Sequence, residues 1–169
     1  KKYGVELLVC SSLNRNSGTM VREKTKMEKM LISGVAADKN VAKIRVAGLG
    51  NDPESTFRLL NLLDRNNLNI DVMIQSLGKD GTKSVSFTVA KPDMLRTIDV
   101  LNDNKDSLGI KKLDYDENVA KISVIGAGVR SHSGVAAKMF GALANAGINT
   151  EMITTSEIRI TALIDEAYA

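Results

Sequence analysis

The sequence predicts an α+β fold made of two βαββαβ units in tandem, with the first unit inserted in the second. Three observations predict it: an internal repeat, the same order of elements in each copy, and one spare strand ahead of the first copy. The chain has 169 residues, of which 43% are hydrophobic and only 4% aromatic. This composition is typical of a globular protein with an aliphatic core.

The internal repeat sets the organisation of the chain. The segment VAKIRVAG at 41–48 returns as VAKISVIG at 119–126, which is 78 residues later. A second echo, LNIDVM at 68–73, returns as INTEMI at 148–153, which is 80 residues later. Because the echoes keep their order and differ by one small insertion, they indicate a duplication.

The first unit can be read element by element. Residues 43–47 alternate polar and apolar as a half-buried strand does, and Pro53 suits the first turn of the helix that follows. Asn66 and Asn67 can end that helix, because Asn tolerates a left-handed conformation. The helix is expected to bury one face carrying Phe57, Leu59, Leu60 and Leu63.

A hairpin and a second helix complete this unit. The hairpin joins strands 69–76 and 84–89 through the turn 78–81. Asp93 is expected to cap the second helix, and residues 110–115 to form the last strand. The apolar face of this helix is expected to carry Met94, Ile98 and Leu101.

The second unit follows the same plan but stops early. Its strand lies at 121–125, its helix ends at Gly147, and its hairpin spans 150–156 and 158–164. The helix face is expected to carry Val135, Met139, Phe140 and Leu143. Because a sheet that lacks a strand has an open edge, we expect the spare strand at 30–37 to complete the second sheet.

Charge and cysteine usage exclude several classes of function. The net charge is +3, and the basic run at 22–29 contains two glutamates, which favours a solvated linker over a nucleic-acid patch. Cys10 is the only cysteine, which suits a buried thiol in a reducing cytoplasm. No signal peptide, membrane-length apolar run or metal-ligand spacing is present, and His132 is expected in an exposed loop.

Two nucleotide-related alternatives remain open. Gly126 and Gly128 after an apolar strand are similar to a dinucleotide-binding turn, but Ser131 occupies the third glycine position. RNA-binding domains also have a βαββαβ plan, yet they stack bases on strand aromatics. Phe87 is the only aromatic residue in the expected central strands, which argues against RNA.

The same geometry also supports a smaller ligand. The β–turn–α junctions at 50–53 and 131–134 can present N–H groups to a carboxylate, and Asn51, Asp71 and Gln75 can accept bonds from an ammonium group. The alternative is that these residues only cap helices and shape turns. The segment 154–157 is polar and forms either a hairpin tip or a row of hydroxyls facing a ligand.

Several stretches resemble the aspartate kinase family. They are the junction made by 11–12, 18–19 and 32–36, the segment 68–71 with Gln75, the segment 121–128, and ITTSEIRI at 153–160. The resemblance runs over nearly the whole chain. It implies two ferredoxin-like ACT domains, the first inserted in the second, and it places the end of the catalytic domain and a linker at 1–29. It implies a strand for the second ACT domain at 30–40, the first ACT domain at 41–117, and the second at 118–169 without its last helix and strand.

The resemblance also implies a function. It implies a non-catalytic regulatory region that binds lysine, threonine or both for feedback inhibition, with no cofactor of its own, while ATP and Mg²⁺ belong to the missing catalytic domain. Implied partners are a second copy through the ACT domains or separate catalytic subunits, in the cytoplasm and without nucleic acid or membrane. An ACT pair that serves another enzyme or regulator, or a bare dimerisation module, is the alternative.

Family positions carry over to thirteen residues of this chain as an expected effector site, the effector being the regulating amino acid. The departures are Asn51 where the family often has Asp, Glu54 where it has Gly, and Ala136 where some relatives have Thr. The expected site residues are Asn51, Ser55, Thr56, Asn69, Ile70, Asp71, Gln75, Val135, Ala136, Asn149, Thr150, Ser156 and Glu157.

Overall fold

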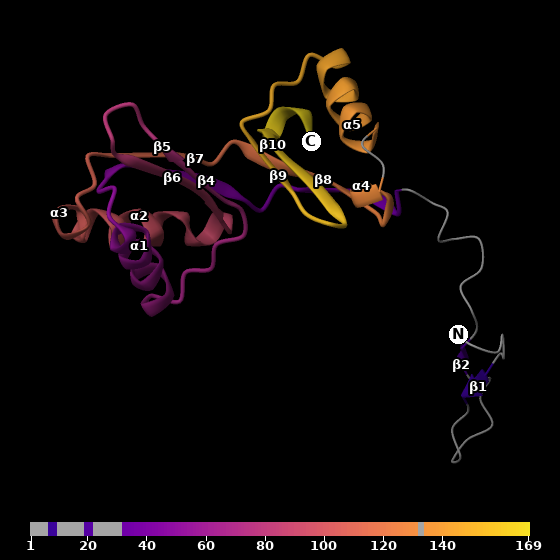
Figure 1. The fold of residues 1–169 in the computed structure, drawn as a ribbon, viewed down its shortest axis with the longest axis horizontal. Helices are drawn as coiled ribbons and strands as arrows, with labels where there is room; N and C mark the ends of the chain where they lie inside the picture. The colour runs from indigo at the N-terminus through magenta and orange to yellow at the C-terminus, as the bar shows by residue number, and fades with distance from the viewer. Residues whose placement is uncertain (1–6, 10–18, 22–31, 132–133) are drawn as a thin grey trace.

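Two four-stranded antiparallel sheets, each with helices on one face, make up most of the structure (Figure 1). It is a computed structural model that describes residues 7–9, 19–21, 32–131 and 134–169. Cys10, His132 and most of 1–31 therefore lie outside the described residues. A short separate ribbon pairs β1 (Leu7–Val9) with β2 (Thr19–Val21). The predicted α+β class is confirmed.

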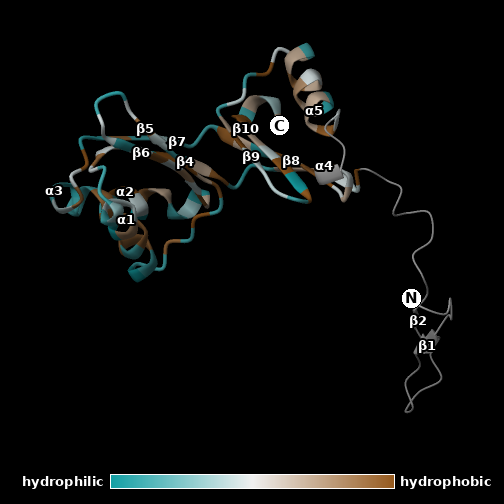
Figure 2. Cartoon of the chain, in the orientation of Figure 1, coloured by the Kyte–Doolittle hydropathy of each residue, from teal (hydrophilic) through white to brown (hydrophobic). Residues whose placement is uncertain are grey.

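The first sheet has the strand order β5–β6–β4–β7. Alternate residues of β4, such as Ile44 and Val46, are fully buried and pack with Leu59 and Leu63 of α1 in one aliphatic core. Figure 2 shows hydrophobic residues gathered in the strands and hydrophilic residues in the connecting loops. The elements of this unit are β4 (Ala42–Leu49), α1 (Pro53–Arg65), β5 (Met73–Leu77), β6 (Lys83–Val89), η2 (Lys91–Asp93), α2 (Met94–Asp103), α3 (Lys105–Leu108) and β7 (Lys112–Asp116).

The second sheet has the order β3–β8–β10–β9 and confirms the predicted insertion. The spare strand β3 pairs antiparallel with β8, and the whole first sheet lies between these two strands in the sequence. Val135 and Met139 of α5 pack on the inner face of the sheet. The elements are β3 (Gly34–Asp38), β8 (Val119–Ile125), α4 (Gly128–Ser131), α5 (Gly134–Asn145), β9 (Met152–Thr155), β10 (Arg159–Asp165) and η3 (Glu166–Tyr168).

The ends of the two main helices are formed in the same way. Asn67 has φ 52° and Gly147 has φ 71°, and both follow the last helical turn as predicted. In each case the next N–H group reaches back to a helix carbonyl, from Leu68 to Leu63 at 3.0 Å and from residue 148 to 143 at 2.9 Å. This left-handed closing motif satisfies carbonyls that the helix leaves free.

Two local predictions for the first unit are wrong. Phe57 is 64% exposed, because α1 buries the stripe Ser55, Leu59 and Leu63, and residue 57 is about 200° around the helix from residue 55. Asp93 does not cap α2 through its side chain, since the chain already turns helically from Lys91 in η2 and gives Asp93 helical backbone angles. Its carbonyl instead accepts a hydrogen bond from the Thr97 hydroxyl at 2.7 Å.

The structure extends the repeat beyond what the sequence analysis identified. The N–H group of Asn40 donates to the Asp38 carboxylate, and that of Asn118 donates to the Asp116 carboxylate, both at 2.9 Å. These matching turns lead from β3 into β4 and from β7 into β8. Each copy therefore donates its leading strand to the sheet of the other copy, because β3 pairs with β8 and β7 pairs with β4.

The two units meet through the helix-free faces of their sheets. Val41, Val119, Met152 and Leu163 form a buried apolar cluster, with Val72 and Ile74 partly buried against it. Val41 and Val119 are equivalent positions of the repeat, so each copy supplies the same position to the cluster. Such self-complementary contact is what a two-fold relation between two copies produces.

Among the residues that the structure describes, three ion pairs cross between the units, and their pattern follows the repeat. Lys43 of the first unit binds Glu151 of the second, and Lys121 of the second binds Asp71 of the first. Lys43 is equivalent to Lys121, and Asp71 is equivalent to Glu151, so these two bridges are reciprocal. The third pair joins Lys91 to Glu166 at 2.7 Å.

Lys91 and Glu166 are equivalent to each other. The N–H groups of the matching residues Asp71 and Glu151 donate to the carbonyls of Thr88 and Leu163, which makes residues 88 and 163 equivalent. Three residues further on, Lys91 begins η2 and Glu166 begins η3, after residues with nearly identical backbone angles. The same position of the repeat is thus Lys91 in one copy and Glu166 in the other, and these two residues form an ion pair with each other.

Candidate functional site

The expected site residues at the start of α1 are already engaged with one another. Asp52 caps the helix, since its Oδ1 accepts bonds from the N–H groups of Glu54 at 3.0 Å and Ser55 at 2.8 Å. Ser55 is buried, and its hydroxyl donates to the Gly50 carbonyl at 2.6 Å. The expectation of free N–H groups here is wrong for residues 54 and 55. Asn51 is exposed beside this cap.

The cap shifts the titration of Asp52. Partial desolvation is the largest single influence and acts to raise the pKa of Asp52. The backbone N–H donors and the Arg58 guanidinium, 3.6 Å away, together outweigh desolvation and lower that pKa below its usual range. The carboxylate therefore stays charged at neutral pH and keeps the helix start formed.

Thr56 and Gln75 link α1 to the free edge of the first sheet. The Thr56 hydroxyl donates to Oε1 of Gln75 at 2.7 Å. Gln75 lies on β5, which is an edge strand, and its side chain is exposed. This hydrogen bond connects the Gln75 amide to α1 at the outer boundary of the sheet.

Asn69, Ile70 and Asp71 form the loop that leads into β5, where the sequence analysis expected strand. Asn69 is exposed, and Ile70 packs against the first core. The Asp71 N–H group still donates to the Thr88 carbonyl at 3.1 Å, which fixes the loop against β6. Its carboxylate is half-exposed and binds Lys121 of the other unit.

The expected site residues of the second unit surround α5 and β9. Val135 is buried in the second core and Ala136 is half-buried against it. Asn149 and Thr150 precede β9, and Ser156 and Glu157 form the turn from β9 to β10. The Ser156 N–H group donates to the Arg159 carbonyl at 2.7 Å, which closes that turn.

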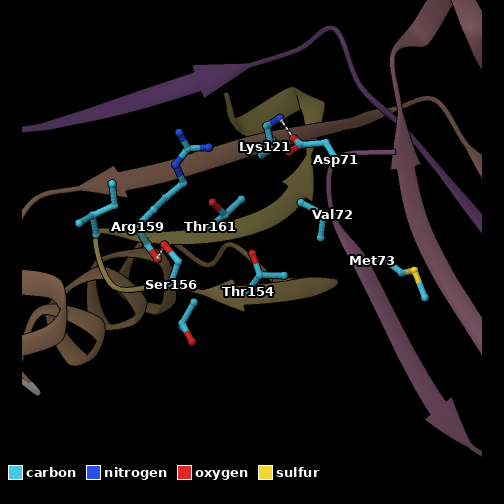
Figure 3. Close-up of a pocket in the computed structure, with 10 residues that line it drawn as sticks. Asp71, Val72, Met73, Lys121, Thr154, Ser156, Arg159 and Thr161 are labelled. Atoms are coloured by element: carbon cyan, nitrogen blue, oxygen red, sulfur yellow. Dashed lines mark hydrogen bonds and ion pairs between the residues drawn. The ribbon is translucent and has the colours of Figure 1, made fainter. Parts of the chain in front are cut away.

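A cavity of about 460 Å³ lies between the units and contains members of both groups (Figure 3). Asp71 from the first unit and Ser156 from the second line it together. Thr56 and Gln75 bond to each other, and Ser55 bonds within the turn before α1. Within one chain, this cavity is where Asp71 of the first group and Ser156 of the second group line a common space.

Lys121, Arg159 and Thr161 line the same cavity and were not among the expected site residues. Lys121 lies on β8 and Arg159 on the paired strand β10, and Thr161 lies between their rows on the sheet (Figure 3). The Thr161 hydroxyl makes a buried hydrogen bond with that of Ser123 at 3.0 Å. The repetition of a lysine at 43 and 121 was the sequence signal for Lys121. It did not indicate a site, because a lysine on a strand usually faces solvent.

Lys121 has an unusual electrostatic environment. Its side chain is only 15% exposed, and its ammonium binds Asp71 and lies 3.2 Å from the Asp38 carboxylate. Burial is the largest single influence and lowers the pKa of Lys121, but the hydrogen bonds and charges of Asp71 and Asp38 together raise that pKa above its ordinary value. A second cavity of about 310 Å³ is lined by Asp71, Lys121 and Asp38 as well.

Two alternative functions find no support in the described geometry. The neighbours of β8 are both antiparallel, so the glycine-rich turn after it does not belong to the parallel crossover of a dinucleotide fold. Phe87 is fully buried in the first core and offers no ring to a base.

The described ranges hold no group of three or more side chains that could bind a metal ion. None of the helices described is long and apolar enough to span a membrane.

Comparison with known proteins identifies the family. A family model of the ACT domain matches residues 122–169. An aspartokinase of Pseudomonas aeruginosa is 36% identical over 170 residues, covering 99% of this chain and 41% of its own length. The chain thus spans about two fifths of the length of the curated relatives it matches.

Two solved structures match over most of their own length. The crystal structure of aspartokinase alpha and beta subunits gives a TM-score of 0.75 at 43% identity, over 81% of this chain and 90% of the other. The ligand-free regulatory subunit of aspartate kinase from Thermus thermophilus gives 0.77 at 32% identity, over 82% and 91%. The chain belongs to the aspartate kinase family and corresponds to its ACT-domain regulatory region.

Proposed function

We propose that this chain senses an end-product amino acid, lysine or threonine, and passes its level to a catalytic aspartate kinase domain. The main support is that the expected site residues of each unit adjoin a sheet edge that is unpaired in the described structure. Gln75 lies on the edge strand β5, while Thr150 and Ser156 flank the edge strand β9.

Unpaired edges are templates for strand addition from another chain. Joining β5 of one copy to β9 of a second copy would bring the first-unit group of one chain to the second-unit group of the other. Apolar side chains at these edges support such contact, because Leu77 is 63% exposed and Ile153 is 44% exposed. The effector site is then completed only in a homodimer.

The polar groups on the two sides suit an α-amino acid. Gln75 and Asn51 provide amide groups, and Asp71 provides a carboxylate for an ammonium group. The expected departure at 51, an amide in place of a carboxylate, removes one negative charge from this side. Asp71 is therefore the principal anionic partner for the effector's ammonium in this proposal.

Control of the catalytic domain requires that the effector bind two arrangements of the ACT domains with different affinity. A coupling free energy of about 1–3 kcal/mol between effector and substrate sites is typical. The reaction under control would be phosphoryl transfer from ATP to the side-chain carboxylate of aspartate. ATP and Mg²⁺ would bind in the catalytic domain and not in this region.

Titration calorimetry tests the proposal. The chain is titrated with lysine and with threonine, separately and together, with methionine and ATP as controls, and its mass is measured in solution with and without effector. We expect saturable heat with lysine, threonine or both, and a dimer. Gln75→Ala should weaken binding, whereas Gln75→Glu should alter the preference between lysine and threonine. A folded, dimeric sample that gives no heat with either amino acid contradicts the proposal.

A further inference from the structure

Asp71 combines an expected role in the effector site with an ion pair that the structure shows. It is the anionic member of the first expected group, and its carboxylate is also bound by the Lys121 ammonium from the other unit. A carboxylate that is held by an internal ammonium is less available to an external one. Lys121 therefore occupies the place that an effector's ammonium would take.

The position of Lys121 makes this competition direct. Asp71 and Lys121 line both the 460 Å³ and the 310 Å³ cavity, so their bridge is reached from either side. The Asp71 side chain is 53% exposed, which leaves it open to a ligand, while Lys121 is 15% exposed and held in place. Asp38, 3.2 Å from the Lys121 ammonium, offers Lys121 a second carboxylate if Asp71 is taken.

The same bridge is one of the two reciprocal bridges between the units. Lys43 and Glu151 form its reciprocal counterpart, and they line neither of these two cavities. Lys43 is opposite Asp116 in the sheet, as Lys121 is opposite Asp38, but Lys43 makes no ion pair with Asp116 within the described structure. The duplicated pairs thus differ in two respects: Lys121 has a second carboxylate beside it, and the Lys121 pair lines the two cavities.

We propose that Lys121 is an internal competitor for the effector's ammonium, which sets effector affinity and releases one of the two reciprocal bridges when the effector takes Asp71. This inference rests on the proposed function. Its regulatory consequence is that the effector weakens the hold between the two ACT units on one side only. The Lys43–Glu151 bridge stays intact, so the units rotate about that bridge and do not separate.

The chain supplies its own matched control for the test. Lys121→Met keeps the length and apolar stem of the side chain but removes the competing charge, and Lys43→Met makes the same change at the reciprocal bridge. We expect Lys121→Met to bind lysine or threonine roughly fivefold more tightly than wild type by calorimetry. Lys43→Met should bind within about twofold of wild type, since neither Lys43 nor Glu151 lines these two cavities.

The possible outcomes separate this inference from the proposed function. If wild type binds the effector but Lys121→Met gains no affinity, or Lys43→Met gains as much, Lys121 is not a competitor and the sensing function still stands. No binding by wild type or by either variant overturns both. If Lys121→Met does not fold, Lys121→Arg decides, because a guanidinium can hold Asp71 and Asp38 together and should weaken effector binding. Unchanged or tighter binding by Lys121→Arg overturns the inference.

Discussion

The charge-reversed pair Lys91–Glu166 gives a sharp test of the internal two-fold relation. Its ammonium and carboxylate are 2.7 Å apart, and each side chain is 31% exposed, so the attraction is worth about 0.5–1 kcal/mol. Lys91→Glu replaces this attraction with a repulsion of similar size. The free energy of unfolding should therefore fall by roughly 1–2 kcal/mol, and the melting temperature by about 2–8 °C for a chain of this length.

A double-mutant cycle isolates the pair from other effects of the substitutions. Glu166→Lys should cost as much as Lys91→Glu, and the double reversal should return to within about 0.5 kcal/mol of wild type. The cycle is measured by urea unfolding followed by circular dichroism. The pair Lys112–Asp114, which is 2.8 Å apart but more exposed and within one unit, is the control and should couple by less than about 0.5 kcal/mol. If the two reversals at 91 and 166 are simply additive, equivalent positions do not meet on an internal axis as we describe.

Three further predictions concern single side chains. Thr88→Val should lower the free energy of unfolding by about 1–3 kcal/mol, because the Thr88 hydroxyl accepts the Val72 N–H bond at 3.1 Å, and Thr88→Ser should recover most of the loss. Because the folded-state pKa of Asp52 is lowered, its contribution is present above about pH 3.8 and lost as pH falls through the folded value. Asp52→Asn should therefore flatten the acid limb of a stability profile against pH. The folded-state pKa of Lys121 is raised, so its contribution is complete below about pH 10.5 and is lost as pH rises through the folded value; Lys121→Met should remove that alkaline loss.

Much of the fold could be predicted because the informative signals are local. The left-handed positions at Asn67 and Gly147 follow from residues that tolerate that conformation. The repeat showed that one set of elements occurs twice, and the spare strand β3 then had one place to pair. These inferences need only the pattern of one segment or the comparison of two.

The errors have local causes too. Phe57 was assigned to the buried face by its hydrophobicity, but burial on α1 follows the spacing of 55, 59 and 63, and Ser55 takes a core position because its hydroxyl bonds to a turn carbonyl. Asp93 resembled an N-cap, but the chain enters the helix earlier through Pro92 and η2. Hydrophobicity and residue type alone did not reveal either alternative.

The candidate site was less predictable because it depends on how the two units meet. The equal spacing of Lys43 and Lys121, and of Asp71 and Glu151, shows equivalent positions but not which lysine binds which carboxylate. Bridges within each unit and bridges between units fit the sequence equally well. Only the arrangement of the helix-free faces makes the pairs reciprocal and places Lys121 beside the expected site residue Asp71.

The exchange of leading strands bears on the order in which the protein folds. Gly34 pairs with Ile125, which is 91 residues further along the chain (125 − 34 = 91), whereas β7 pairs with a strand of the unit that precedes it. During synthesis from the N-terminus, β4 to β7 can form a complete sheet while β3 still has no partner. Closing a loop of this length makes the pairing of β3 a late and slow step. Until β8 emerges, the nascent chain carries an unpaired strand whose edge can join another nascent copy, so newly made chains are most prone to misassembly in that interval.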